Sequence, residues 1–157
     1  MPFAAGPVLC YIGAGQYKTI GPTEYVGEHE VIRIPSDFPT DLASVPRLFW
    51  ALLPPNGSYE RAAVVHDWAC VHLATGDCVV SSRDADGLFR RIAREEGTGL
   101  LTRWHLWAGV RVGALLNKHR RPGIARDLPL VALIGLLDLA VVGAVVVGLD
   151  HSVHLVF

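Results

Sequence analysis

The chain has few cysteines, and they do not form a motif. Cys10, Cys70 and Cys78 contain no CxxC pair and are odd in number, so they predict neither a zinc knuckle nor a disulfide framework. The N-terminus also lacks the basic segment and the long apolar run of a signal peptide. We therefore expect reduced thiols and a domain that is made in the cytosol.

An excess of charge of one sign is also missing. Lys and Arg number 14 against 15 Asp and Glu, which gives a formal net charge of -1 over 157 residues. A nucleic-acid-binding chain is favoured by a one-sided positive field, so we expect no nucleic acid among the partners. No segment recurs at a fixed period, and the length suits one domain with its own core plus one appended element.

One long hydrophobic run is present. Residues 128–149 read LPLVALIGLLDLAVVGAVVVGL, and Asp138 is their only charge. This length matches the bilayer core, and a helix that is apolar on every face needs more enclosing protein than this chain has. The sequence predicts a transmembrane helix over 128–149, after a soluble domain (1–117) and a basic juxtamembrane linker (118–127), and before a short tail (150–157).

The basic residues ahead of this run place the N-terminal domain on the cytoplasmic side by the positive-inside tendency. Asp138 is costly inside a membrane and usually has a partner there. It predicts self-association of the helix into a homo-oligomer. The alternative is a buried hairpin inside an oligomer.

The rest of the chain predicts an α+β fold. Short β-favouring pieces over residues 8–35, separated by glycines, predict two or three antiparallel strands. A proline-rich loop follows, with a short helix at residues 47–53. Helices are expected at 58–75 and 83–96, and the two pack together as a hairpin. The second helix is capped by Ser81 or Ser82 and ended by Gly97. A third, amphipathic helix covers 99–119.

An adjacent His–Asp pair, His66 and Asp67, lies in the middle of the first predicted helix. The helical face of His66 is made of small or apolar residues: Ala62, Ala69, Cys70 and Leu73. His66 should therefore be buried against another helix, where its imidazole needs a hydrogen-bond partner. Asp86 lies at the edge of the apolar stripe of the second helix, so an antiparallel hairpin would place it opposite His66.

This arrangement predicts acid–base chemistry. A histidine oriented by one carboxylate can activate water, while a neighbouring carboxylate binds a cation that polarises the substrate oxygen. His66 and Asp86 are the predicted catalytic residues, and Asp67 and Asp41 the predicted metal ligands. The alternative, which the residues leave equally open, is a structural His–Asp hydrogen bond between packed helices.

Two arginines are candidates for substrate binding. Arg47 and Arg83 can each bind a lipid phosphate, or can form an ion pair with Asp41 or Asp84. A metal-dependent phosphohydrolase is a further alternative for the His–Asp pair, but the chain offers no additional well-spaced histidines for it.

Four motifs follow one another in order: TDLASVPR (40–47), AAVVHDW (62–68), SRDAD with LF after it (82–89) and GVRVGA (109–114). Over residues 34–114 this series resembles Domain of Unknown Function 1353, a family of phages and prophages. The resemblance implies a phage or prophage origin but no established activity. With that origin, the predicted transmembrane helix places the protein in the inner membrane of a bacterial host. The family's HDWLY reads HDWAC here, with Cys70 in place of an aromatic residue.

A second resemblance concerns mechanism. The HD pair followed about twenty residues later by AD is similar to the compact phospholipase A2 domains of viral capsid proteins. By position it implies His66 as the base, Asp67 as a calcium ligand and Asp86 as the orienting carboxylate. The nearest match to that class's glycine-rich calcium loop is PPNGSY, which holds only Gly57.

Together these features predict a membrane-anchored phage protein that hydrolyses lipid esters, with Ca²⁺ as cofactor and a lipid membrane as partner. The alternative is a non-enzymatic phage protein, structural or lysis-associated, in which the His–Asp pair only joins two helices.

Overall fold

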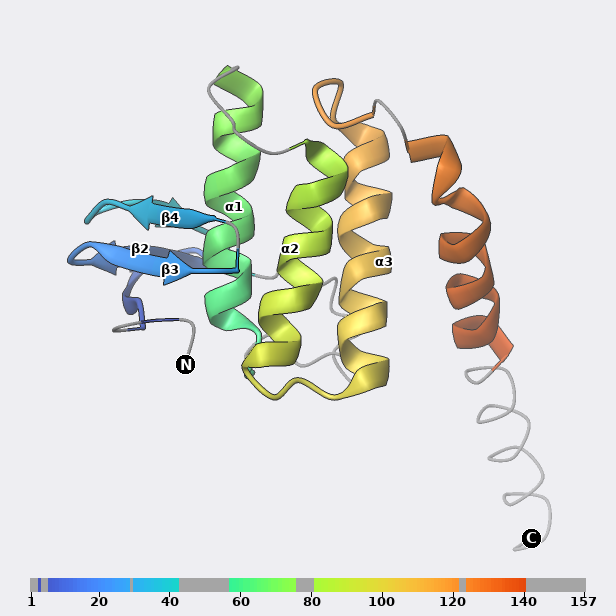
Figure 1. Ribbon diagram of the computed structural model, residues 1–157, viewed down its shortest axis with the longest axis horizontal. Helices are drawn as coiled ribbons and strands as arrows, with labels where there is room; N and C mark the ends of the chain where they lie inside the picture. Colours follow the sequence, from blue (N-terminus) through green and yellow to red (C-terminus); the bar gives the residue numbers. More distant parts are fainter. Residues whose placement is uncertain are drawn as a thin grey trace, which may run out of the picture.

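The computed structural model describes residue 3 and residues 6–28, 30–42, 57–75, 81–121 and 124–140. Short antiparallel strands make up its N-terminal part and helices its C-terminal part (Figure 1). The predicted α+β class is confirmed. The loop helix expected at residues 47–53 and the tail at 150–157 lie outside the described residues.

Within the described residues, five short strands form two small sheets. In the first, β2 (Gln16–Ile20) pairs on one side with β1 (Val8–Gly13) and on the other with the two-residue β5 (Pro39–Thr40). In the second, β3 (Thr23–Val26) pairs with β4 (Val31–Ile34). All pairings are antiparallel. The sequence predicted only two or three strands, because β2 and β5 are recognisable mainly through their partners across the sheet.

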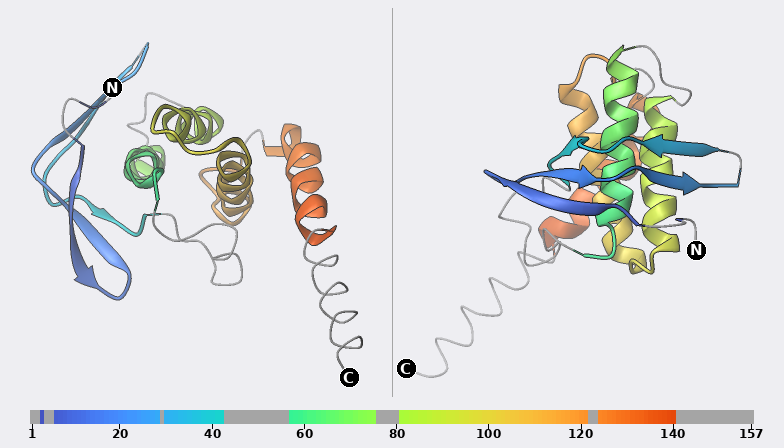
Figure 2. Two further views of the ribbon diagram at one scale, coloured as in Figure 1. Left: turned by 90° about the horizontal axis from the view of Figure 1, so that it is seen from below. Right: turned by 90° about the vertical axis from the view of Figure 1, so that its left-hand side faces the viewer.

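Three helices stand side by side behind these strands. They are α1 (Glu60–Thr75), α2 (Ser82–Glu95) and α3 (Leu100–Leu116). In Figure 2 the strands lie on the α1 side of this row, and the helical residues 128–140 lie on the α3 side. The short 3₁₀ helix η2 (Ile124–Arg126) lies in the chain between α3 and the helical residues 128–140. The middle helix, α2, therefore contacts a helix on each side.

The interface between α1 and its neighbours is made of small side chains. Ala62 and Ala69 are buried, as the helical wheel predicted, whereas Cys70 and Leu73 of the same face are half-buried. Val64 and Val65 are also buried. Small residues allow close approach of the helices. Several of the larger core side chains come from the strands and from α2: Tyr25, Ile34, Leu88, Phe89 and Ile92. This packing places the middle of α1 beside the middle of α2.

The ends of α2 follow the sequence signals. Ser81 is the N-cap, and its hydroxyl accepts a hydrogen bond from the backbone N–H of Asp84 at 3.2 Å. Gly97 follows the helix with a φ of 83°, and its N–H donates to the carbonyl of Arg94 at 3.0 Å. This left-handed end is one that glycine adopts at little cost.

Two glycines of this region provide a matched pair of predictions. A Cβ added at Gly87 or at Gly97 would meet no atom within 4 Å, but only Gly97 has a positive φ. Gly87→Ala should raise the free energy of unfolding by about 0.5–1 kcal/mol, because alanine favours the helix interior. Gly97→Ala should lower it by about 1 kcal/mol, because of its left-handed backbone. Urea unfolding of both variants measures the difference, and shifts in the same direction would contradict the assignment.

The predicted transmembrane helix is corrected by the structure. Among the described residues, no helix combines the length and apolar character needed to cross a bilayer. Residues 128–140 are helical, but at 1.5 Å per residue they span about 20 Å, against a hydrocarbon core of about 30 Å. Residues 141–149, the remainder of the predicted span, lie outside the described residues.

The charge inside this segment has a partner within the domain. Asp138 Oδ1 lies 2.5 Å from Nε2 of His105 on α3, so this part of the hydrophobic run is held against α3. The inner-membrane location, which was inferred from a transmembrane helix, is corrected for the same reason. Self-association through the segment stays a prediction, and several of its leucines are exposed: Leu133, Leu136, Leu137 and Leu139.

Candidate functional site

His66 and Asp86 meet at the contact between α1 and α2. Nε2 of His66 lies 2.7 Å from Oδ1 of Asp86, and the imidazole also rests against the ring of Phe89. His66 is only 6% exposed and Asp86 is fully buried. The pairing that the helical wheel predicted is therefore present, although its chemical role stays a prediction.

Asp86 has two further partners that the sequence did not suggest. Nη1 of Arg111 donates to Asp86 Oδ2 at 2.7 Å, and Nη2 of Arg120 donates to Oδ1 at 2.5 Å. Oδ1 thus accepts hydrogen bonds from both His66 and Arg120. Arg120 Nη2 and His66 Nε2 lie 3.3 Å apart because both donate to this one oxygen. Arg111 is fully buried, so Asp86 is the counter-charge that its guanidinium requires.

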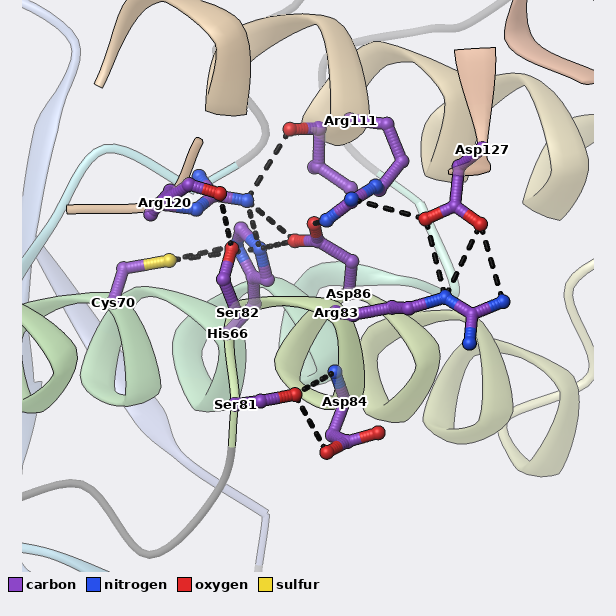
Figure 3. Close-up of polar contacts among 11 residues, drawn as sticks. His66, Cys70, Ser81, Ser82, Arg83, Asp84, Asp86, Arg111, Arg120 and Asp127 are labelled. Atoms are coloured by element: carbon purple, nitrogen blue, oxygen red, sulfur yellow. Dashed lines mark hydrogen bonds and ion pairs between the residues drawn. The ribbon is translucent and has the colours of Figure 1, made fainter. Parts of the chain in front are cut away.

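The network continues to Asp127, as Figure 3 shows. Nη2 of Arg111 is 3.0 Å from Asp127 Oδ2, an ion pair without hydrogen-bond geometry. Arg83 lies on the outer side of Asp127, with Nε 3.1 Å from Oδ1 and 3.2 Å from Oδ2. Carboxylates and guanidinium groups therefore alternate from Arg83 to Arg120, and they join α2, α3 and the segment after α3.

The other ring nitrogen of His66 faces a different group of residues. Nδ1 lies 3.9 Å from Asp67 Oδ1 and 3.9 Å from the Cys70 sulfur. Asp67 is in turn held by Thr40 of β5, whose hydroxyl donates to Oδ2 at 2.5 Å. Nε2 is thus fixed by a short hydrogen bond, whereas Nδ1 has only longer contacts among the described residues.

Burial and charge act in opposite directions on these groups. Burial would lower the pKa of His66, but the carboxylates of Asp67 and Asp86 outweigh it and hold that pKa well above 6.5. Burial would raise the pKa of Asp86, but His66, Arg120 and Arg111 keep that pKa below its ordinary value. For Asp67, burial dominates, with help from the charge of Asp41, and its pKa is raised despite His66 and Thr40.

The raised pKa of His66 predicts a pH-dependent contribution to stability. A pKa that is higher in the folded state stabilises the fold fully below the unfolded value of about 6.5, and this stabilisation is lost as pH rises through the folded pKa. The difference in unfolding free energy between wild type and His66→Gln should therefore shrink from about pH 6 to about pH 9. Urea unfolding at both values measures it, and a difference that grows with pH would contradict the assignment.

The remaining predicted site residues are placed as follows. Asp41 directly follows β5 and is close enough to act electrostatically on Asp67. Arg83 is half-exposed and forms an ion pair with Asp127 rather than with Asp84. Arg47 lies outside the described residues. Cys70 places its sulfur 3.6 Å from His66 Nε2, alongside the ring.

The described residues do not by themselves fit a calcium ion. Ca²⁺ takes six to eight oxygen ligands, whereas this side of His66 offers the carboxylates of Asp67 and Asp41. Asp67 already accepts the Thr40 hydroxyl. No group of three or more His, Cys, Asp or Glu side chains in the described part of the chain is arranged to hold a metal. We therefore assign no step of a reaction to a metal.

Sequence reasoning missed Arg111, Arg120 and Asp127. A usable signal existed for Arg111, because it interrupts an apolar helical face in the motif GVRVGA. Arg120 and Asp127 lie in a segment that looks like a basic linker, and nothing local marks them as buried. The structure nevertheless leaves them only 8% and 5% exposed.

A family model described as a protein of unknown function, DUF1353, matches residues 18–110. The chain belongs to this family. No curated protein and no solved structure matches the chain. The DUF1353 region contains His66, Asp67 and Asp86, whereas Arg111 and Arg120 follow its last matched residue. The buried ion network therefore ties the DUF1353 region to the part of the chain that comes after it.

Proposed function

We propose that the protein hydrolyses lipid esters, with His66 as the general base and Asp86 as the residue that orients it. One observation carries the proposal. Asp86 fixes Nε2 of His66 at 2.7 Å, while the contacts of Nδ1 with Asp67 and Cys70 are both 3.9 Å. An imidazole held at one nitrogen, with the other available to a water molecule, is the usual arrangement of an oriented general base.

The proposed reaction uses both nitrogens of the ring. Nδ1 takes a proton from water as the water oxygen attacks the ester carbonyl, and it then returns that proton to the departing alcohol oxygen. The Nε2–H keeps its hydrogen bond to Asp86 throughout, so the carboxylate stabilises the imidazolium that forms. The nearby Asp67 carboxylate favours the same charged state of the ring.

This mechanism has a consequence for pH. The base form of His66 is the neutral ring, and its raised pKa makes that form scarce near neutral pH but a stronger base when it is present. Activity should therefore rise with pH above about 6.5 and level off only above the raised pKa.

The test is release of fatty acid from bacterial phospholipid vesicles and from a soluble short-chain ester by the purified full-length chain. Wild type is compared with His66→Gln and with His119→Gln, a control that removes an exposed histidine. Each assay is run with calcium and with chelator. Release that His66→Gln abolishes and His119→Gln preserves supports the proposal. Absence of release from correctly folded wild type on both substrates overturns it.

A second candidate is favoured by the burial of Asp86. Its two oxygens already accept three donors from α1, α3 and the segment after α3. A carboxylate used in this way can serve purely to join the helices of a non-enzymatic phage structural or lysis-associated protein. Absence of activity in the assay above would favour this role. The phage or prophage source that both candidates assume stays a prediction.

A further inference from the structure

A groove of about 240 Å³ between α2 and α3 is lined almost entirely by arginines. Gly87, Arg90, Arg91 and Arg94 come from α2, and Arg103 comes from α3. Within the described part of the chain, no acidic side chain lines it. The two helices run side by side (Figure 1), and arginines from both line this one groove.

Three of these charges have no counter-ion among the described residues. Arg91 is paired with Glu30 and lies 3.9 Å from Glu95. Arg90, Arg94 and Arg103 form no ion pair within the same residues. Three neighbouring cations without a counter-charge repel one another, and this repulsion opposes folding. An anion bound between them would relieve it.

Arg90 is the one of the three that contacts an aromatic ring among the described residues. Its guanidinium carbon lies 4.1 Å from the centre of the Trp104 ring, which fixes the side chain by a cation–π contact. Its Nε is buried and has no hydrogen-bond partner among the described residues. Burial, together with the charges of Arg103 and Arg94, lowers the pKa of Arg90. A buried donor without an acceptor is costly, and an anion's oxygen would satisfy it.

A larger groove of about 440 Å³ adjoins the first and shares Gly87, Arg90 and Arg91 with it. Its additional lining is mixed. Leu88, Trp104, Trp107 and Leu130 are apolar or aromatic, whereas Glu30, Arg83, Asp84 and Asp127 are charged. Gly87 contributes no side chain to either groove, and the space beside it is open. A ligand would match these two grooves if its anionic group lay in the arginine-lined groove, away from the three carboxylates, and its apolar or ring-shaped body lay against the aromatic part of the larger one.

We propose that Arg90, Arg94 and Arg103 bind the phosphate group of a small organic phosphate, whose body rests against Trp104. Guanidinium groups bind phosphate oxygens in a bidentate manner, and several around one anion give both affinity and orientation. The phosphate can belong to a soluble metabolite or to a lipid headgroup. The site is built from residues other than His66 and Asp67 and does not depend on the proposed hydrolysis.

The experiment is calorimetric titration of the full-length chain with inorganic pyrophosphate at about 0.15 M NaCl, where exposed charges are already screened beyond about 8 Å. Wild type is compared with the double variant Arg94→Gln/Arg103→Gln, which leaves Arg90 and its contact with Trp104 in place. A charge-matched control, Arg33→Gln/Arg126→Gln, removes two exposed arginines elsewhere. Circular dichroism and thermal unfolding establish that each variant is folded.

We expect wild type and the control to bind with a dissociation constant below about 1 mM, and the groove variant at least tenfold more weakly. The groove variant should also melt no lower than wild type without ligand, because it removes repulsion. Equal binding by all three proteins, or no binding by wild type, overturns the proposal. If phosphatidylglycerol vesicles compete with pyrophosphate for the groove, the phosphate belongs to a lipid headgroup. If glycerol 3-phosphate competes and the vesicles do not, it belongs to a soluble ligand.

Discussion

Replacing Asp86 with asparagine is expected to lower the free energy of unfolding by about 3–5 kcal/mol, a large share of the stability of a small domain. The carboxylate is fully buried and faces three donors, two of them guanidinium groups. Asparagine has nearly the same shape, so packing is preserved while the negative charge is lost. Among the residues that the structure describes, Arg111 would keep only Asp127 as a counter-charge. Uncompensated buried charge is the dominant cost of this change.

Urea unfolding measures the effect of Asp86→Asn, with Asp84→Asn as the control on the same helix. Asp84 is exposed and contacts Ser81 at the start of α2, so its neutralisation should cost about 1 kcal/mol or less. Arg111→Met should be strongly non-additive with Asp86→Asn, because either change already breaks the same ion pair. A loss below about 1 kcal/mol for Asp86→Asn would show that the network does not hold the helices together.

Replacing His66 with glutamine is expected to lower kcat for ester hydrolysis by a factor of about 10²–10⁴, the usual contribution of a positioned general base. Glutamine can still donate a hydrogen bond toward Asp86, but it cannot take a proton from water. Above the raised pKa of His66, the variant should lose only about 1 kcal/mol of stability, because Asp86 keeps the two arginines that neutralise it. A large kinetic effect beside a small stability effect would separate catalysis from structure.

The measurement pairs kcat and KM on the soluble ester with urea unfolding of the same preparation. KM should change little, because His66 is not assigned to substrate binding. If His66→Gln retains wild-type kcat, the histidine is not the base. If it instead loses 3 kcal/mol or more of stability, the imidazole rather than the arginines is the main partner of Asp86.

The hydrophobic run that begins at Leu128 shows the limit of reading a segment by its composition. Its length and apolar character predicted a transmembrane helix, yet the described residues contain no helix able to span a bilayer. The charge of Asp138 within this run predicts a partner in the membrane or in an oligomer. Its partner is His105, 33 residues earlier on α3 of the same chain. Composition records how apolar a segment is, but not what that segment packs against.

The sequence by itself determined the features that local backbone geometry controls. Helical periodicity, the Ser81 cap and Gly97 defined α2, and the short connection between two helices was enough to place Asp86 opposite His66. Only the tertiary structure decided that Arg111 and Arg120, 25 and 34 residues beyond Asp86, would share its carboxylate. The physical reason is that hydrogen bonds within a helix depend on neighbours in sequence, whereas the neutralisation of a buried charge depends on which distant side chains the packed helices bring to it.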